Sequence, residues 1–245
     1  MKFIGFAIAI LIALIIPPHS TDAQRRESSE VEATELLRQV VAAYHSLSTY
    51  SDRGTAVVHM AGSDTVYTVE FETLFKRPNK VRFAWTSESS HTPGHKQTGV
   101  IWCDGETAWG SYSFHGNQPA RKENLEVAVA GATGASWGTA PTILGLLVDR
   151  FHEMIRLDER QGFKIAGNGT ASGVKSLILA AVDKDGNERK VWVGREDHLI
   201  RRIEERWKGW TRKGWQWKGG RREEVRTQIV VNQDLADSRF SKEGR

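Results

Sequence analysis

The sequence predicts an α+β fold, in which an unclosed antiparallel β half-barrel of about ten strands is covered on its concave face by helices. Stretches of alternating apolar and polar residues recur between residues 55 and 232. Tight-turn sequences such as Gly62-Ser63-Asp64 and Asp104-Gly105 separate these stretches. Helical periodicity is confined to an N-terminal segment and an insert at 121–155, so the strand–helix alternation of a parallel sheet is missing.

The N-terminal residues 1–23 have the organisation of a secretory signal peptide. Lys2 precedes an apolar run from Phe3 to Ile16, and small residues end the segment at Ala23. Such a run is shorter than the roughly 18 to 20 residues that span a bilayer, although an uncleaved anchor is the alternative. We therefore expect cleavage, export to the periplasm, and a single domain over residues 24–245.

The segment 29–47 predicts an amphipathic helix. Ser29 and Glu32 have the spacing of a capping box at its start. The apolar residues that follow recur with the period of one helix face, which must pack on an apolar surface. These residues are Ala33, Leu36, Leu37, Val40, Val41, Tyr44 and Leu47.

After Gly54 the period changes to two, which indicates strands. A hairpin around residues 62–64 is followed by a basic corner at Arg77-Pro78, because proline suits a turn better than a central strand. The alternation then resumes, and one face of these strands collects Tyr67, Val69, Phe71, Phe75, Val81, Phe83 and Trp85.

The middle of the chain predicts a helical insert, and strands return after it. We expect a short helix at 121–131, a loop at 132–138 and a second helix at 139–155, with Pro141 in its first turn. Further strands are expected at 163–167, 174–182, 189–194, 198–207 and 223–232. A large antiparallel sheet with helices on one face fits this order.

Three short motifs resemble the LolA/LolB-like lipoprotein carriers of the bacterial envelope. They are "FKRPNKVRFAW" (75–85), "CDGETAWGSY" (103–112) and the tail "KVWVGREDHLIRRIEE" with "IVVNQDLADSRF". The resemblance covers nearly the whole chain after the signal peptide. The longer "SESSHTPGHKQ" loop and a tryptophan-rich basic segment depart from the carrier pattern.

This resemblance implies a helical lid over a cavity for acyl chains, and it implies that Arg77 helps to hold the lid closed. We expect Arg77 to bond helix-end carbonyl groups where helices 29–47 and 140–151 meet, since a guanidinium donates bidentately. The residues expected to line the lipid cavity are Val69, Phe71, Val81, Phe83, Trp85, Trp102, Leu144 and Leu147.

The formal net charge of +4 is unevenly distributed. Residues 201–226 hold ten Lys or Arg against four Glu, which places +6 in this segment. Its tryptophans suggest contact with an anionic membrane surface, and an ordinary solvated hairpin is the alternative. Nucleic acid is a poor partner for an exported chain. The membrane-surface residues would be Trp207, Lys208, Trp210, Arg212, Lys213, Trp215 and Trp217.

Catalytic and metal-binding patterns are weak. "GASWG" matches a nucleophile elbow at Ser136, with Asp149 or Asp183 and then His198 downstream, but that motif needs a parallel sheet. His91 and His95 have no acidic or Cys partner nearby, so we expect no metal and no cofactor. Cys103 is the only cysteine, which excludes an internal disulfide.

We therefore expect a monomeric, non-enzymatic binding protein that holds an acyl chain or lipoprotein lipid for transport or sorting in the envelope. The first alternative is an envelope sensor or scaffold that binds a partner protein with the same half-barrel. A serine hydrolase at Ser136 is a distant third.

Overall fold

The computed structural model describes residues 22–148, 162–212 and 215–243, with the backbone alone at 22–28, 210–212 and 215–217. The helices described are α1 (Asp22–Ser46), α2 (Leu125–Ala135), α3 (Ala140–Leu147) and the 3-10 turns η1 (Ser113–His115) and η4 (Asp237–Arg239). The strands described are β1 (Thr49–Met60), β2 (Val66–Lys76), β3 (Lys80–Ser89), β4 (Lys96–Cys103), β5 (Ala108–Tyr112), β6 (Ala120–Lys122), β7 (Lys164–Ala171), β8 (Val174–Val182), β9 (Glu188–Gly194), β10 (Ile200–Trp207), β11 (Trp210–Arg212), β12 (Trp215–Trp217) and β13 (Gly220–Val231).

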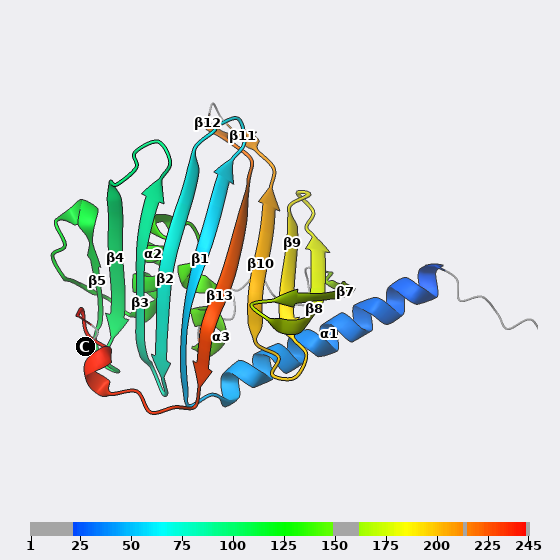
Figure 1. Ribbon diagram of the computed structural model, residues 1–245, viewed down its shortest axis with the longest axis horizontal. Helices are drawn as coiled ribbons and strands as arrows, with labels where there is room; N and C mark the ends of the chain where they lie inside the picture. Colours follow the sequence, from blue (N-terminus) through cyan, green and yellow to red (C-terminus); the bar gives the residue numbers. More distant parts are fainter. Residues whose placement is uncertain (1–21, 149–161, 213–214, 244–245) are drawn as a thin grey trace, which may run out of the picture.

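Eleven of the described strands form one sheet in the order β6-β5-β4-β3-β2-β1-β13-β10-β9-β8-β7, and β11 pairs with β12. Every neighbouring pair in this sheet is antiparallel. The edge strands β6 and β7 lie at opposite ends of the order, so the half-barrel is unclosed. Helices α2 and α3 lie behind the sheet in Figure 1. The α+β half-barrel predicted from the sequence is confirmed.

The alternation of β2 and β3 defines the two faces of the sheet. Phe71 pairs with Trp85, and Phe75 pairs with Val81, so these apolar side chains share the concave face under the helices. Glu72 and the residues in register with it point to the opposite, convex face. The period of two therefore placed the apolar side chains of these two strands correctly.

Helix α1 buries the predicted stripe against the sheet, with Val41 only half buried. It begins at Asp22, however, so Ser29 lies inside the helix, and the predicted capping-box start is wrong. The Ser29 hydroxyl instead meets the backbone of Ile165 on β7, accepting from its N–H at 3.1 Å. Glu30 pairs with Lys164 at 2.9 Å on the same strand. Helix α1 thus covers the β7 edge of the sheet.

The helical insert begins later in the chain than predicted. Helix α2 begins after Asn124, whose side chain accepts from the N–H of Val127 at 2.9 Å as an N-cap. The residues just before it form the short edge strand β6, and α2 runs to Ala135 through most of the predicted loop. Helix α3 has Pro141 in its first turn, as predicted, and residues 149–155 of the second predicted helix lie outside the described residues.

After β13 the C-terminal segment runs along the lower end of the sheet toward β4 and β5 (Figure 1). Leu235 and Phe240 pack on Leu74, which β2 presents on the convex face. Lys76 and Lys80 bind the Asp237 carboxylate at 2.9 and 2.6 Å. These hydrogen bonds hold the pKa of Asp237 below its usual value. The signal peptide and the single-domain division stay predictions, because residues 1–21 lie outside the described chain.

Candidate functional site: the concave face and its helical cover

The concave face has an apolar floor beneath α2 and α3. Its β2–β3 part combines Val69, Phe71, Val81, Phe83 and Trp85, five of the residues predicted for a lipid cavity, and all are buried. Phe83 stacks near Phe71 and Trp85, with ring centroids 5.9 and 5.6 Å away. Leu144 and Leu147 reach the same core from α3. Seven of the eight predicted cavity residues therefore lie together in one apolar core.

Trp102 is the exception, and its placement in the cavity is wrong. It pairs with Arg82 and Trp109 on the convex face, where the two indole rings stack at 6.0 Å. Its neighbours in β4, Ile101 and Cys103, face the floor instead. Burial raises the pKa of the Cys103 thiol, as expected for a small buried hydrophobe.

Arg77 binds the C-terminal end of α1. Its Nε donates to the carbonyl of Leu47 at 2.8 Å, and its Nη2 donates to the carbonyls of Tyr44 and His45 at 3.3 and 2.5 Å. The last carbonyls of a helix have no partner inside it, so a guanidinium satisfies several of them at once. The Arg-Pro corner, whose Arg77–Pro78 peptide is cis, is thereby joined to one of the two expected helices.

A row of ion pairs crosses the middle of the concave face, and we call it the charged ladder. Its members come from β1, β13, β10 and β9 and alternate in sign along the row. All six side chains point to the same face as the apolar floor. On β13, Arg226, Glu224 and Arg222 stand in register with Gly54, Ala56 and Val58 of β1. Glu205 in turn stands in register with Arg222 and with Arg189. The charged ladder consists of Asp52, Arg226, Glu224, Arg222, Glu205 and Arg189.

The charged ladder is most deeply buried at its β1 end. The side chains of Asp52 and Glu224 are fully buried, and that of Arg226 between them is 1% exposed. Burial alone would lower the pKa of Arg226, but the Asp52 and Glu224 carboxylates raise it above its usual value. Tyr50 donates its hydroxyl to Asp52 at 2.6 Å, and burial, with Asp52 beside it, raises the pKa of that phenol. Removing one of these buried charged groups would leave its partner uncompensated and would destabilise the fold.

Toward β9 the charged ladder becomes more exposed to water. Arg222 binds Glu205 at 2.8 Å, and Glu205 accepts from Nε of Arg189 at 2.7 Å. The side chains of Glu205 and Arg189 are 21% and 18% exposed. The row thus runs from a dry end at β1 to a partly hydrated end at β9.

The bend between α2 and α3, residues 136–139, rests on the charged ladder. Arg222 Nη1 donates to the carbonyl of Trp137 at 2.9 Å. In the first turn of α3, the Thr142 hydroxyl lies 3.3 Å from the Glu224 carboxylate and 3.2 Å from the carbonyl of Gly138, and its one proton is shared between these two acceptors. The Trp137 ring lies 4.1 Å from that of Tyr67. Gly138 has φ +82°, and a Cβ there would lie 2.6 Å from Arg222, so the bend requires glycine to approach so closely.

The sequence did not suggest the charged ladder. In "RREEVR" the residues Arg222, Glu224 and Arg226 look like part of a solvated basic strand. Their partner Asp52 lies 174 residues from Arg226 in the chain. The signal that could have revealed them was the alternation of β1, which places Asp52 in phase with the apolar residues Tyr50, Ala56 and Val58.

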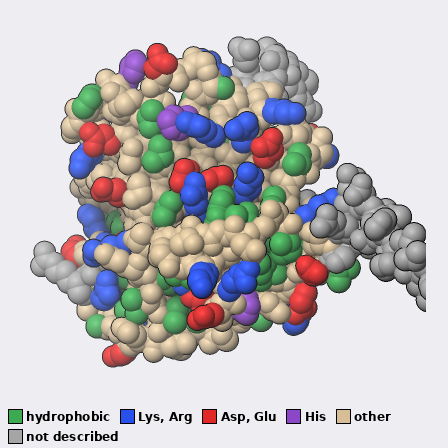
Figure 2. Space-filling view, turned by 45° about the vertical axis from the view of Figure 1, so that its right-hand side comes forward, with side chains coloured by type: hydrophobic (Ala, Val, Ile, Leu, Met, Phe, Trp, Pro, Cys, Tyr) green, Lys and Arg blue, Asp and Glu red, His purple; other side chains and the backbone are tan. Residues whose placement is uncertain are grey.

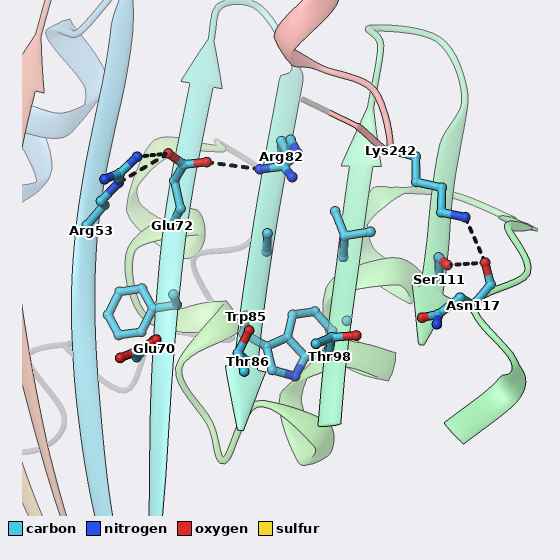
Figure 3. A pocket seen from close by; sticks show the side chains of 14 residues that line it. Arg53, Glu70, Glu72, Arg82, Trp85, Thr86, Thr98, Ser111, Asn117 and Lys242 are labelled. Atoms are coloured by element: carbon cyan, nitrogen blue, oxygen red, sulfur yellow. Dashed lines mark hydrogen bonds and ion pairs between the residues drawn. The ribbon is translucent and has the colours of Figure 1, made fainter. Parts of the chain in front are cut away.

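The convex face carries an open hollow of about 480 Å³ (Figure 3). Glu72 accepts from Arg82 at 3.0 Å and contacts Arg53 at 3.5 Å, forming an ion-pair row across β1, β2 and β3. At the other side Lys242 of the C-terminal segment donates to the carbonyl of Asn117 at 2.8 Å. Ion pairs and hydrogen bonds between lining residues cross this hollow, whereas among the described residues no such pairs cross the β2–β3 part of the apolar floor.

Part of the predicted membrane segment can be placed. Trp207 is half buried and donates to the carbonyl of Lys218 at 3.3 Å, while Lys208 is exposed. Trp210, Arg212, Lys213, Trp215 and Trp217 have side chains outside the described residues. Figure 2 shows basic and acidic side chains interspersed over the described part of one face. Two arginines of the 201–226 segment, Arg222 and Arg226, belong to the charged ladder and add no positive charge to the surface.

Ser136 ends α2 and caps the next helix. Its buried hydroxyl accepts from the N–H of Ala140 at 3.1 Å and lies 3.5 Å from the carbonyl of Thr133. Asp183 accepts from its own turn, from the N–H groups of Asp185 and Asn187, and Asp149 lies outside the described residues. The contacts of Ser136 are those of a helix cap.

Two features are absent from the residues that the structure describes. No helix in that part of the chain is long and apolar enough to cross a membrane. The same part of the chain contains no group of three His, Cys, Asp or Glu that could hold a metal ion. His91 lies in a surface loop, with Nδ1 3.3 Å from the Thr65 hydroxyl.

No family model matches the sequence, and no curated protein matches it. Solved structures do match. The lipoprotein LppX of Mycobacterium tuberculosis has 9% identity and a TM-score of 0.47, over 85% of this chain and 99% of that one. The Pseudomonas aeruginosa MucA/MucB complex matches at 15% identity and a TM-score of 0.44, over 86% of this chain and 60% of that one.

A LolA superfamily protein of Nitrosomonas europaea matches at 11% identity and a TM-score of 0.36, over 86% of this chain and 98% of that one.

Proposed function

We propose that this protein is an exported, monomeric binding protein that holds an acyl chain on its concave face, for transport or sorting of lipid or lipoprotein in the cell envelope. The observation that carries the proposal is the pairing of an apolar floor with an apolar cover. Six of the eight residues of α3 are buried, and they pack on the same core as the floor. Displacing this cover would open an apolar surface on β2 and β3, bordered by the charged ladder.

The physics of acyl binding fits such a movable cover. Burying a saturated chain gains roughly 0.8 kcal/mol per CH₂, so a permanently open apolar groove would release a long chain slowly. A cover that returns to the floor competes with the ligand and speeds its release. The bend supplies such a cover, because only a few polar contacts fasten it to the charged ladder.

Replacing Phe83 tests the proposal directly. Phe83→Asp places a charge in the middle of the floor, and we expect it to abolish the binding of a fluorescent fatty acid. Ala84→Asp is the matched control, since Ala84 is the next residue and faces the convex side. Circular dichroism checks that both variants fold. If Phe83→Asp destabilises the core, Phe83→Ala should still weaken binding. Wild-type affinity in both folded Phe83 variants would remove the floor from the site.

The alternative function, a sensor or scaffold that binds a partner protein, is favoured by one observation. The floor is already filled by side chains of the helices, with Val69, Phe83 and Leu144 fully buried. Native mass spectrometry of protein from its own envelope separates the two functions. A carrier should retain an acyl lipid at unit stoichiometry, whereas a scaffold should be free of lipid and associated with a protein.

We extend the proposal to a transient contact between the tryptophan-rich segment and an anionic membrane surface. Exposed Lys208 and Lys218 flank the segment on both sides. Replacing Lys208, Arg212, Lys213 and Lys218 together should weaken binding to anionic vesicles at low salt, because the attraction is screened over about 8 Å at physiological ionic strength. Equal affinity of the wild type for neutral and anionic vesicles would reduce the segment to a hairpin.

A further inference from the structure

The α2–α3 unit presents an unusual combination of groups to the concave face. Its aliphatic side chains Ile143, Leu144 and Leu147 lie in the core. Beside them it offers one carbonyl oxygen, of Trp137, to Arg222, and one hydroxyl, of Thr142, to Glu224. An aliphatic body next to one acceptor and one hydroxyl donor is also the chemistry of an acylglycerol.

We propose that the charged ladder is a headgroup subsite for an uncharged acyl ester such as an acylglycerol, and that the α2–α3 bend occupies this subsite in the closed protein. This inference rests on the proposed function, because it requires the acyl chain to lie on the adjoining floor. The ligand's ester carbonyl and hydroxyl would replace the Trp137 carbonyl and the Thr142 hydroxyl as partners of the charged ladder.

The floor and the charged ladder are directly adjacent. The guanidinium of Arg226 lies 4.8 Å from the centre of the Phe71 ring, which belongs to the floor. Phe71 in turn stacks near Phe83. On the other side of the charged ladder, Ile203 stands in register with Glu224 on the same face. A chain lying on Phe71 and Phe83 would therefore end with its polar group at Arg226 and Glu224.

The charge of the charged ladder selects against ionic headgroups. Its three guanidinium groups balance its three carboxylates. An added phosphate or carboxylate would leave a net negative charge in a region where Glu224 and Asp52 are fully buried. A buried charge without a partner is strongly unfavourable, so a neutral polar headgroup is the complementary ligand.

The charged ladder also retains hydrogen-bonding capacity. Among the described residues, Nε of Arg222, Nε of Arg226 and Oδ1 of Asp52 are buried without a hydrogen-bond partner. Two of these atoms are donors and one is an acceptor, which suits hydroxyl and ester oxygens. The bend therefore satisfies only part of what the charged ladder can bind, and a glycerol headgroup has more such groups than the bend presents.

The first experiment measures headgroup preference with two probes that differ by one phosphate. Monooleoylglycerol and oleoyl lysophosphatidic acid, each below its critical micelle concentration, compete with a fluorescent monoacylglycerol for the wild-type protein. We expect monooleoylglycerol to compete at a concentration at least tenfold lower. Failure of the wild type to bind any of these acyl probes would overturn the proposed function together with the inference. Equal competition by the two probes would overturn the inference alone.

The second experiment changes the charge on one face at a time. Glu205→Gln gives the charged ladder an excess positive charge and should shift the preference toward the phosphate by at least tenfold. Glu204→Gln is the matched control, because it makes the same change of net charge one residue away on the convex face, where Glu204 pairs with Arg202. Equal preference in the two variants would overturn the headgroup assignment.

A third variant tests the competition by the bend and does not depend on the folding of Glu205→Gln. Thr142→Val removes the hydroxyl that contacts Glu224 and the Gly138 carbonyl, and it keeps the shape of the side chain. We expect severalfold tighter binding of monooleoylglycerol, because the closed bend competes less well. Unchanged or weaker binding in the folded variant would mean that the bend does not occupy the ligand's place.

Discussion

Two contacts join helices to the concave side of the half-barrel, and they differ in kind. At the end of α1, Arg77 makes three hydrogen bonds to backbone carbonyls, and the helix also buries a full apolar stripe and covers the β7 edge. At the α2–α3 bend, the described polar contacts with the sheet are one hydrogen bond from Arg222 of the charged ladder to the Trp137 carbonyl and the contact of the Thr142 hydroxyl with Glu224.

The difference indicates which cover can move. Lifting α1 would expose its apolar stripe to water. It would also break the hydrogen bonds that the Arg77 side chain donates to the backbone carbonyls at the end of the helix. Lifting the bend would expose the charged ladder to water, which solvates ions well and offsets part of the loss of apolar contact. We infer that α1 is the fixed part of the cover and that α2–α3 is the exchangeable part.

The largest effect is expected at the buried β1 end of the charged ladder. Arg226→Met leaves Asp52 and Glu224 buried without their shared partner, which should lower the free energy of unfolding by about 3–5 kcal/mol. Urea denaturation measures this loss. Adding Asp52→Asn and Glu224→Gln to Arg226→Met should recover much of the lost stability, because Asp52 and Glu224 are then no longer buried charges without a partner. A loss below about 1 kcal/mol in Arg226→Met would show that the charged ladder is hydrated and weakly coupled.

Arg77→Leu should have an intermediate effect, limited to the α1 side. The loss of hydrogen bonds to the carbonyls of Tyr44, His45 and Leu47 should cost about 1.5–3 kcal/mol. Amide exchange should accelerate at the C-terminal turn of α1, while residues 125–147 stay as in the wild type. Acceleration in 125–147 instead would make Arg77 a latch of the exchangeable cover, as the sequence motif implied.

Thr142→Val should have a smaller effect, limited to the other side. Removing one hydrogen bond to a carboxylate should lower stability by about 1–2 kcal/mol. Exchange of the amides in 125–147 should accelerate at least severalfold, with no change in α1. Comparison of this pattern with that of Arg77→Leu is the sharpest test of the two covers. Identical patterns would mean that all three helices open as one unit.

The smallest effect is expected on the convex face, away from both covers. The pKa of Asp237 is held low by Lys76 and Lys80, so the stabilisation it provides is present above its ordinary pKa of about 4 and is lost as the pH falls through the lowered value. Limited proteolysis of the C-terminal segment should therefore increase only in strong acid for the wild type. Asp237→Asn should show the increased cleavage at neutral pH, with acyl binding unaffected.

The sequence allowed some of this arrangement to be predicted and concealed the rest. Strict alternation in β2 and β3 assigned Phe71, Phe83 and Trp85 to the floor, because one face of each strand is apolar and the other polar. Around Trp102 the residues Val100, Ile101 and Cys103 are also apolar, so periodicity could not tell the two faces of β4 apart.

The charged ladder lay beyond local reasoning for a different reason. A strand with buried Arg222, Glu224 and Arg226 has the same composition as an exposed strand, and only the distant partners on β1, β10 and α3 show that these charges are satisfied inside. The capping-box prediction at Ser29 failed because α1 begins at Asp22, so that the serine lies inside the helix and contacts Ile165 on β7.

Hydrogen–deuterium exchange of the wild type, with and without saturating monooleoylglycerol, tests the central claim most directly. If the ligand takes the place of the exchangeable cover on an acyl-binding floor, amides in 125–147 should exchange faster in the complex. The floor strands β2 and β3 should exchange more slowly, and α1 should be unchanged. Slower exchange in 125–147, or the same exchange throughout the chain with and without the lipid, would contradict it.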